Sequence, residues 1–289
     1  MQNSSHMAFE SKESWTILST IEQSIKKKIE TIGTPLKEWD INIYRGILTG
    51  FNEAFIISGE KKDELIAADP KSAEIIRPIL RGRDIKRYDY EFANLWLINA
   101  HNGVKEQNIT PINIADYPAI KSHLDQYYEK LAKRADKGCT PYNLRNCAYM
   151  DDFSKQKICW IELTDESKFS YSDDGIYLLN TVFFMVGENI KYLIAALNSS
   201  LIRWYFLTCI GTTSGVGTNR WLKYTVETIP IVRPSDLSIY EISNQVDKVI
   251  EAKKFKQNSA KYEHEIDVLL MNSYNLTYEE QQYILSFEK

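Results

Sequence analysis

The hydrophobic pattern of this 289-residue chain changes its period at Pro230 and Pro234. Before these prolines, short runs in which apolar and polar residues alternate predict β-strands that bury one face. After them, apolar residues recur at spacings of three and four, which is the period of an amphipathic helix. Because proline interrupts both kinds of element, we predict an α+β body, residues 35–232, followed by a helical C-terminal segment, residues 233–289.

The body is predicted to contain strands and helices without an internal repeat. The predicted strands are Ile41–Thr49, Ala54–Ile57, Leu95–Asn99, Ile158–Leu163 and Gly175–Val186. The predicted helices are Ser72–Leu80, a helix that follows Pro118, and Asn189–Ile210. Within the last helix, Asn198 and Ser199 are expected to serve packing or the junction between a strand and a helix.

The N-terminal part is predicted to form a single helix, residues 8–34. Its apolar residues recur at spacings of three and four, and Gly33 and Pro35 then end the helix. Residues 1–7 have the look of an expression-vector remnant. We therefore expect the native sequence to begin near Ala8 and the chain to be a piece of a longer protein.

The C-terminal segment is predicted to form three helices. Ser238–Glu241 and Thr277–Glu280 have the spacing of a capping box, in which a hydroxyl and a carboxylate satisfy the free backbone N–H groups of a helix start. Asn275 is expected to end the second helix. From Glu241 to the C-terminus there are nine acidic and six basic residues, a net charge of −3.

The charge of the chain is unevenly distributed. The net charge is −4, which by itself argues weakly against binding to nucleic acid. Within residues 77–88, however, Asp84 is the one acidic residue among five basic residues. These basic residues are Arg77, Arg81, Arg83, Lys86 and Arg87. The sequence therefore predicts a basic patch in the body beside an acidic tail.

The four cysteines and the lack of long apolar runs indicate the compartment. No two cysteines form a CxxC pair, and the cysteines and the three histidines beyond residue 7 give no zinc spacing. No apolar run approaches the ~20 residues of a membrane helix, and the N-terminus lacks the apolar segment of a signal peptide. We predict free thiols in the reducing cytoplasm, with no metal site and no membrane association.

The sequence also lacks recognisable catalytic motifs. The chain contains no Pro-Pro pair, so it cannot form the Asn/Asp-Pro-Pro-aromatic loop with which DNA amino-methyltransferases hold a flipped base. The glycine-rich residues 211–218 lack the Lys-Ser/Thr of a phosphate-binding loop. Glu166-Ser167-Lys168 has the Glu-x-Lys spacing of some nucleases, but this spacing is common by chance. We predict no catalytic residue and no cofactor in this chain.

Five blocks carry a resemblance to a known family. In chain order they are Gly46-Ile-Leu-Thr-Gly-Phe-Asn-Glu-Ala-Phe55, Ile75-Ile-Arg-Pro-Ile-Leu-Arg-Gly-Arg-Asp-Ile-Lys-Arg-Tyr88, Thr140-Pro-Tyr-Asn-Leu-Arg145, Leu193–Leu201, and Tyr262-Glu-His-Glu-Ile-Asp267 with Leu276-Thr-Tyr-Glu-Glu280. In this order they resemble the TaqI-like C-terminal specificity domain of type IIG restriction–modification enzymes and adenine-specific DNA methyltransferases.

The resemblance implies a fold, a function and partners. The fold would be a mixed, curved β-sheet with packed helices, similar to the target-recognition domains of type I specificity subunits, followed by a helical segment. The function would be sequence-specific recognition of double-stranded DNA. The parent enzyme would methylate adenine with S-adenosylmethionine and, where it also cuts DNA, use Mg²⁺. The partner would be an upstream methyltransferase domain of the same polypeptide or a separate methyltransferase subunit.

The candidate DNA-binding residues are centred on the basic patch. Arginine can pair with guanine O6 and N7, and lysine can neutralise phosphates. Glycine permits a tight turn or a close approach of the backbone. The candidates in this patch are Arg81, Gly82, Arg83, Lys86 and Arg87. The alternative is a cluster of surface salt bridges around Asp84.

Further candidates lie in three polar loops. Asn52 follows a turn signal and could read adenine or simply favour the turn. Arg145 and Asn146 lie in a polar loop, and Thr218, Asn219 and Arg220 lie in or after the glycine-rich loop. The last three are suited to contacts with backbone oxygens, with an ordinary flexible loop as the alternative.

Two other functions stay open from the sequence alone. The amphipathic N-terminal helix and the acidic helical tail could mediate protein–protein contacts, so the chain could be an interaction module or a specificity subunit that partners a separate methyltransferase. An independent enzyme is the third possibility, and the missing motifs argue against it.

Overall fold

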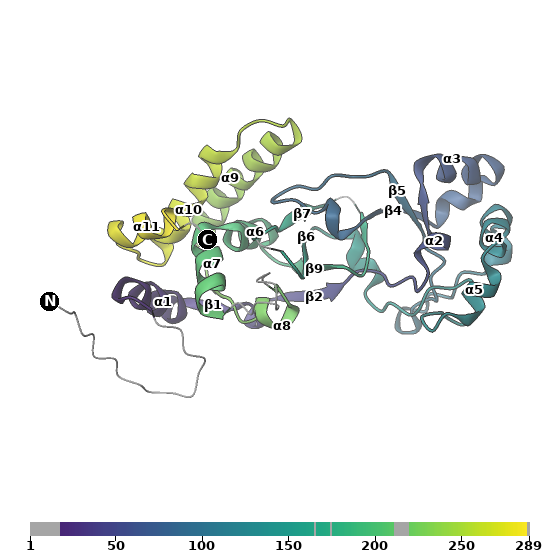
Figure 1. Cartoon of the computed structure of the whole chain (residues 1–289), viewed down its shortest axis with the longest axis horizontal. Coiled ribbons are helices and arrows are strands. Elements are labelled where there is room, and N and C mark those ends of the chain that lie inside the picture. The colour runs from purple at the N-terminus through teal and green to yellow at the C-terminus, as the bar shows by residue number, and fades with distance from the viewer. Residues whose placement is uncertain (1–17, 165, 174, 211–219, 288–289) are drawn as a thin grey trace.

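The helices gather at the two ends of an elongated molecule (Figure 1). This computed structural model describes residues 18–287, except for residues 165, 174 and 211–219. The α-helices are α1 (Thr20–Ile32), α2 (Asn52–Phe55), α3 (Gly59–Ala68), α4 (Pro118–Asp125), α5 (Tyr128–Lys133), α6 (Ile190–Asn198), α7 (Ser200–Tyr205), α8 (Lys223–Val226), α9 (Asp236–Lys254), α10 (Ala260–Ser273) and α11 (Tyr278–Leu285). Short 3-10 turns η1–η6 cover Leu36–Glu38, Pro70–Glu74, Gly82–Asp84, Lys105–Gln107, Ile114–Asp116 and Met150–Ser154, and a π-turn, η7, covers Phe206–Ile210.

In the part of the chain that the structure describes, the strands form three sheets. They are β1 (Gly33–Pro35), β2 (Ile41–Arg45), β3 (Ile56–Ser58), β4 (Ile76–Leu80), β5 (Leu95–Ile98), β6 (Lys157–Ile161), β7 (Ser170–Ser172), β8 (Tyr177–Leu178), β9 (Val182–Gly187) and β10 (Pro230–Val232). One antiparallel sheet has the order β2-β9-β6-β7, and a second has the order β3-β5-β4-β8, in which β4 and β8 are parallel. The third is the antiparallel pair β1-β10.

The sheet β2-β9-β6-β7 separates two hydrophobic cores. Successive residues of a strand point to opposite faces, so in β9 Phe183 and Met185 enter one core while Phe184 and Val186 enter the other. Because both faces are covered, β9 is a continuous apolar run and does not alternate with polar residues. This sheet is therefore the internal wall of the molecule.

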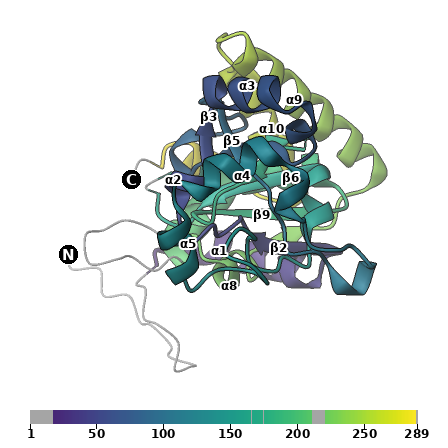
Figure 2. The same cartoon turned by 90° about the vertical axis from the view of Figure 1, so that its right-hand side faces the viewer.

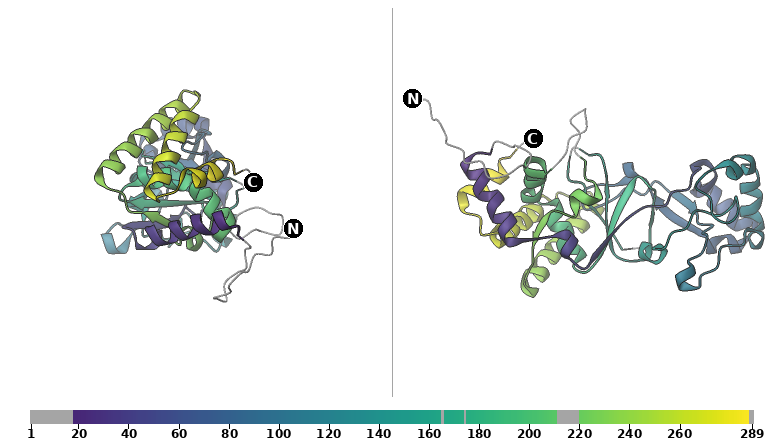
Figure 3. Two further views of the ribbon diagram at one scale, coloured as in Figure 1. Left: turned by 90° about the vertical axis from the view of Figure 1, so that its left-hand side faces the viewer. Right: turned by 90° about the horizontal axis from the view of Figure 1, so that it is seen from below.

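The C-terminal helices share the first core with the body. Val246 of α9 and Leu270 of α10 are buried in the same core as Ile29 of α1 and Trp204 of α7. Figure 3 shows this end, with α1 in purple and the C-terminal helices in yellow-green to yellow. The predicted boundary between residues 34 and 35 falls inside β1, which pairs with β10 and so joins the N-terminal helix to the end of the body.

The second core lies under the sheet β3-β5-β4-β8 and the helices of the opposite end. Leu65 of α3 and Leu124 of α4 pack into it together with Leu97 of β5, and Figure 2 shows α3 and α4 in front of β5. The mixed α+β fold predicted from the sequence is confirmed. Among the described residues, however, the strands are divided among three sheets, and the sheet β3-β5-β4-β8 is the mixed one.

Several local predictions are wrong because tertiary pairing overrides local preference. Residues Ile76–Leu80, predicted as part of a helix, form the strand β4, since both β5 and β8 hydrogen-bond to it. The single strand predicted for Gly175–Val186 is two strands, because β8 joins one sheet and β9 the other. Ala54 and Phe55, predicted to begin a strand, end the short helix α2.

Of the two capping boxes predicted from the sequence, one is confirmed and one is wrong. The capping box at Thr277 and Glu280 is confirmed. The box predicted at Ser238 is wrong, because α9 begins three residues earlier and Ser235 accepts the hydrogen bond from the N–H of Ser238. Asn275 follows α10 with a φ of 54°, a left-handed conformation that asparagine tolerates.

In the part of the chain that the structure describes, no single helix is long and apolar enough to cross a membrane. The helical segments Ile190–Asn198 and Ser200–Ile210 together have that length and composition, but the chain bends by 56° between them.

Candidate nucleic-acid interface

Four of the five basic residues of the patch lie in one loop, residues 81–91, called here the basic loop, whereas Arg77 lies in β4. The basic loop leaves β4, passes β7 and reaches α10 before the chain returns to β5 (Figure 1). Tyr88 forms an isolated parallel bridge with Ser170 of β7, and Arg87 contacts Glu263 of α10. The loop is therefore attached to the body and to the C-terminal helices.

The first end of the basic loop is fixed by Asp84. Its Oδ2 accepts hydrogen bonds from the backbone N (2.8 Å) and the Nε (3.0 Å) of Arg81, and its Oδ1 accepts from Nη2 (2.8 Å). Burial alone would raise the pKa of Asp84, but the bonds from Arg81 bring it below its usual value. The salt-bridge alternative thus describes Arg81, whose side chain is used to close the turn.

The second end is fixed by Tyr88, whose side chain is buried in the first core. The backbone of Tyr88 has a φ of 66°, which costs free energy for a bulky residue. Its N–H donates to the carbonyl O of Phe169 at 2.8 Å. Burial raises the pKa of the Tyr88 hydroxyl, so it stays neutral. The packing of the ring and this backbone bond hold the strained conformation.

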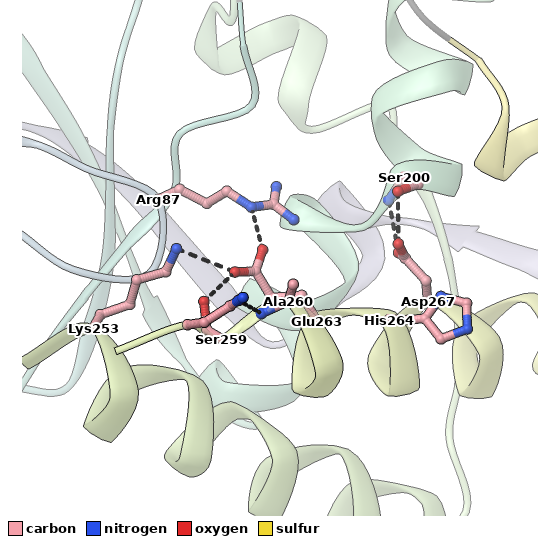
Figure 4. Close-up of a pocket in the computed structure, with 9 residues that line it drawn as sticks. Arg87, Ser200, Lys253, Ser259, Ala260, Glu263, His264 and Asp267 are labelled. Atoms are coloured by element: carbon pink, nitrogen blue, oxygen red, sulfur yellow. Dashed lines mark hydrogen bonds and ion pairs between the residues drawn. The ribbon is translucent and has the colours of Figure 1, made fainter. Parts of the chain in front are cut away.

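Arg87 joins the basic loop to the C-terminal helices. Its Nε donates to Glu263 Oε2 at 2.7 Å, and its Nη1 donates to the carbonyl O of Asn198. Glu263 also accepts from Ser259 Oγ at 2.7 Å and pairs with Lys253 at 3.2 Å (Figure 4). These groups line a polar cavity of about 360 Å³. Arg87 was predicted as a DNA contact, but its guanidinium is occupied within the protein.

Asn198 stabilises the same junction between the basic loop and the C-terminal helices. Its side chain is fully buried and bonds to both backbone groups of Phe169, donating to O at 2.8 Å and accepting from N at 3.1 Å. Asp267 accepts from the N (2.8 Å) and Oγ (2.6 Å) of Ser200 nearby. Three of the five sequence blocks, Ile75–Tyr88, Leu193–Leu201 and Tyr262–Asp267, therefore meet at one place.

Arg83 and Lys86 are the basic residues of the loop whose side chains form no buried ion pair, so they can contact a ligand. Arg83 is exposed. Lys86 is half-buried; its Nζ donates to the carbonyl O of Arg83 at 3.5 Å and lies 3.4 Å from the exposed Glu91, a pair that contributes little in water.

Lys168, which was not among the predicted DNA contacts, directly precedes Phe169 and so lies close to Tyr88, whose N–H bonds to Phe169. It pairs with the exposed Glu166 at 3.5 Å. No local sequence signal places Lys168 beside the basic loop.

Gly82 permits a close approach. A Cβ at this position would lie 3.2 Å from Ile161 Cγ2 and 3.4 Å from Thr181 Oγ1. Its φ is not in the left-handed region, so of the two predicted roles the structure favours close packing. Ile161 is followed by Glu162, whose Oε1 lies 2.5 Å from Arg220 Nη2. Arg220 therefore contacts the residue that follows Ile161, against which Gly82 packs.

The other candidates are separated from this loop. Thr218 and Asn219 lie outside the described residues. Asn52 accepts a hydrogen bond from Thr49 Oγ1 at 2.6 Å at the start of α2. Arg145 pairs with Asp136 at 3.3 Å, and Asn146 accepts from Asn102. The structure therefore does not bring all the candidates into one site.

A buried arginine organises this second group of candidates. Arg134 donates to the backbone carbonyls of Thr49, Asp136, Pro141 and Asn143. Its guanidinium also lies over the ring of Phe55 at 4.6 Å. Burial lowers its pKa to about 10, so it is charged at neutral pH. Arg134 thus ties the turn before Asn52 to the loop that carries Arg145.

Replacing Arg134 by methionine is expected to destabilise the chain by about 3 kcal/mol. Methionine fills part of the volume, but buried carbonyls lose their donor, and each unsatisfied group costs roughly 1–3 kcal/mol. Urea unfolding measures the loss. Lys133→Met is the matched control, because Lys133 is exposed and its replacement is expected to change stability by less than about 0.5 kcal/mol. Equal stability of the two variants would contradict the role given to Arg134.

The comparison with known families identifies the chain. Residues 77–231 match the family model of the TaqI-like C-terminal specificity domain. The chain belongs to this family. The specificity domain predicted from the sequence is thereby confirmed. This matched segment includes the basic loop, but the C-terminal helices lie beyond it.

Two solved structures have a similar fold. The first is the type IIL restriction-modification enzyme MmeI in complex with DNA, with a TM-score of 0.64 and 13% identity, over 88% of this chain and 37% of that one. The second is the type IIG restriction endonuclease BpuSI, with a TM-score of 0.53 and 14% identity, over 91% of this chain and 34% of that one. This specificity domain thus spans about a third of the length of either enzyme.

The Glu263 carboxylate gives the junction a measurable dependence on pH. Burial alone would raise its pKa, but the charge of Arg87 and the bonds from Ser259 and Arg87 hold it at about 2, below the ordinary 4.5. A carboxyl whose pKa is lowered by folding stabilises the protein above its unfolded pKa. That contribution is lost as the pH falls from about 4.5 to about 2.

Glu263→Gln is therefore expected to cost roughly 3 kcal/mol near neutral pH, since each unit of pKa shift is worth about 1.4 kcal/mol. Below pH 4.5 the difference between the two proteins should shrink. Burial raises the pKa of the neighbouring Asp267, so its contribution to stability changes with pH in the opposite direction. Asp267 is present in both proteins, so this contribution largely cancels from the difference between them. Urea unfolding at several pH values measures the difference, and a difference independent of pH would contradict the assignment.

Proposed function

We propose that this specificity domain recognises a target sequence in double-stranded DNA with the basic loop, as part of a longer restriction–modification enzyme. The observation that carries the proposal is the construction of the loop. Arg83 and Lys86 project from a segment that is fixed at both ends, by Asp84 and by Tyr88. A rigid loop loses little conformational freedom on binding, so its cations can be presented at defined positions.

Arg83 and Lys86 would have different tasks. An arginine can form two hydrogen bonds to guanine in the major groove, whereas a lysine acts as a point charge that suits phosphates. Base contacts provide specificity, and phosphate contacts fix the register on the duplex. In this proposal Arg83 is the candidate reader and Lys86 the candidate phosphate contact. Lys168 and Arg220 would add phosphate contacts beside them.

The chemistry of the parent enzyme would reside outside this chain. An upstream methyltransferase domain, or a separate subunit, would bind S-adenosylmethionine and methylate adenine, and any nuclease domain would use Mg²⁺. No group of three or more metal-ligating side chains is found in the part of the chain that the structure describes. Calorimetry with S-adenosylmethionine tests the assignment of the cofactor, and micromolar binding by this chain would overturn it.

A binding experiment tests the main proposal. The chain is titrated with a duplex of mixed sequence over a range of salt concentrations, and the bound duplexes are then sequenced. We expect affinity to fall with salt, because neutralised phosphates release counterions, and we expect one sequence to be enriched. Binding that is insensitive to salt, or that enriches no sequence, would overturn the proposal.

The second candidate function is a protein–protein interface on the C-terminal helices. Leu237 and Tyr240 of α9 and Tyr278 of α11 are between 65% and 78% exposed, which is unusual for large apolar side chains. These residues fit contacts with a methyltransferase domain or subunit. Tight binding to the separate methyltransferase, abolished by Leu237→Ser with Tyr240→Ser, would favour this function, and both functions can belong to one chain.

A further inference from the structure

The turn between α9 and α10 has a charge opposite to that of the rest of the tail. Residues 252–262, called here the lysine turn, contain four lysines and no acidic residue. The lysines are Lys253, Lys254, Lys256 and Lys261. From Glu241 to the C-terminus only two further basic residues occur, against nine acidic ones. The summed charge of −3 therefore hides a local concentration of positive charge.

The backbone of the lysine turn is held by its own hydrogen bonds. Lys256 has a φ of 54°, its N–H donates to Lys253 O at 2.9 Å, and the N–H of Gln257 donates to Ala252 O at 2.8 Å. Ser259 is buried at the start of α10. The turn thus presents its side chains from a defined backbone, as the basic loop does.

Three of the four lysines are free to meet a ligand. Lys254, Lys256 and Lys261 are exposed. Lys253 is the one drawn inward, by its ion pair with Glu263 at 3.2 Å. An exposed lysine that the fold does not use can neutralise a phosphate without breaking an internal contact.

The lysine turn borders the basic loop. One carboxylate, that of Glu263, contacts both Lys253 of the turn and Arg87 of the loop (Figure 4). Lys86 of the loop directly precedes Arg87. The two positively charged segments are therefore neighbours in space, although about 170 residues separate them in the sequence.

We propose that the lysine turn is a second contact with the DNA backbone, beside the bases that the basic loop reads. This inference rests on the proposed function. Continuity with the basic loop, through their shared partner Glu263, favours a duplex over an acidic protein surface. Lysines make phosphate contacts as compact charges and do not depend on a particular base. The lysine turn should therefore raise affinity equally for every sequence.

The test neutralises two lysines of the turn. Lys254→Gln with Lys261→Gln removes two charges and leaves Lys256, with its left-handed backbone, unchanged. Binding of a mixed-sequence duplex is measured as a function of salt. Each lost phosphate contact is expected to lower the log–log salt slope by about 0.9, and the affinity at moderate salt by about tenfold. Preference among sequences should stay the same.

The matched control is Lys27→Gln with Lys37→Gln. These lysines are exposed. Lys27 belongs to α1, and Figure 1 shows α1 away from the turn between α9 and α10. The control makes the same change in net charge and should leave the salt slope unchanged. An equal effect of both double variants would overturn the inference, since it would reflect net charge alone. A changed sequence preference would also contradict a backbone contact.

The outcome is distinguishable from failure of the proposed function. If replacement of Arg83 and Lys86 abolishes binding while the lysine-turn variant binds as the unmodified chain does, the second contact is wrong and the proposed function stands. If the chain does not bind duplex DNA at all, the proposed function fails, and the second contact fails with it. Circular dichroism of each variant verifies that the fold is retained.

Discussion

Replacement of Arg83 and Lys86 by alanine is expected to abolish most of the sequence-specific DNA affinity of this chain. Both side chains belong to the basic loop, but neither fixes its ends: Asp84 and Tyr88 do so, and Lys86 adds only a long 3.5 Å bond to the carbonyl O of Arg83. The fold should therefore survive. Loss of an arginine that pairs with guanine costs about 1–3 kcal/mol on the specific site. Loss of a phosphate contact lowers the log–log salt slope by about 0.9.

The single variants separate reading from positioning. Arg83→Ala should weaken binding to the preferred sequence and relax the preference at one base pair. Lys86→Ala should weaken binding to every duplex and leave the preference intact. Selection of bound duplexes followed by salt titration measures both effects. If the double variant kept the affinity, preference and salt slope of the unmodified chain, the basic loop would not be the DNA site.

The structure also restricts which arginines can be used in this test. Arg81 closes the loop on Asp84, and Arg87 ties it to Glu263. Replacement of either arginine would change the conformation of the loop. A weaker affinity for DNA could then not be assigned to the loss of a direct contact. Lys27→Ala with Lys37→Ala is the matched control for the double variant, because it removes two exposed charges elsewhere.

Replacement of Asn198 by alanine is expected to cost about 2–4 kcal/mol. The Asn198 side chain is fully buried and satisfies both backbone groups of Phe169. Without it, a buried N–H loses its partner, and an unsatisfied buried group costs roughly 1–3 kcal/mol. The carbonyl of Phe169 keeps its bond from Tyr88, so the loss is less than complete. Thermal and urea unfolding measure the effect.

The same substitution should weaken DNA binding at temperatures well below unfolding. Phe169 accepts the hydrogen bond that fixes Tyr88, so a displaced Phe169 would release the strained end of the basic loop. Asn42→Ala is the matched control, because Asn42 is exposed on β2 and should change stability by less than about 0.5 kcal/mol. An Asn198→Ala protein as stable as this control would show that the side-chain bonds to Phe169 contribute nothing.

The sequence by itself determined what depends on neighbouring residues. The change of period at Pro230 and Pro234 gave the α+β body and the helical tail, and the capping box at Thr277 gave the start of α11. These signals work because helix periodicity and helix caps involve residues within about four positions of each other. The ordered blocks gave the family, which the match over residues 77–231 confirms.

Tertiary structure alone decided which charges are available for a ligand. Arg81, Arg83 and Arg87 are the same residue type in the sequence, but Arg87 pairs with Glu263, which is 176 positions away. Likewise, the summed charge of the tail is negative, although its lysine turn lies beside the basic loop. The assignment of β8 and β9 to two different sheets could also not be predicted from the residues of this segment alone. The physical reason is the same in each case: ion pairing and strand pairing depend on distance in space, which an alternation of residue types along the chain does not specify.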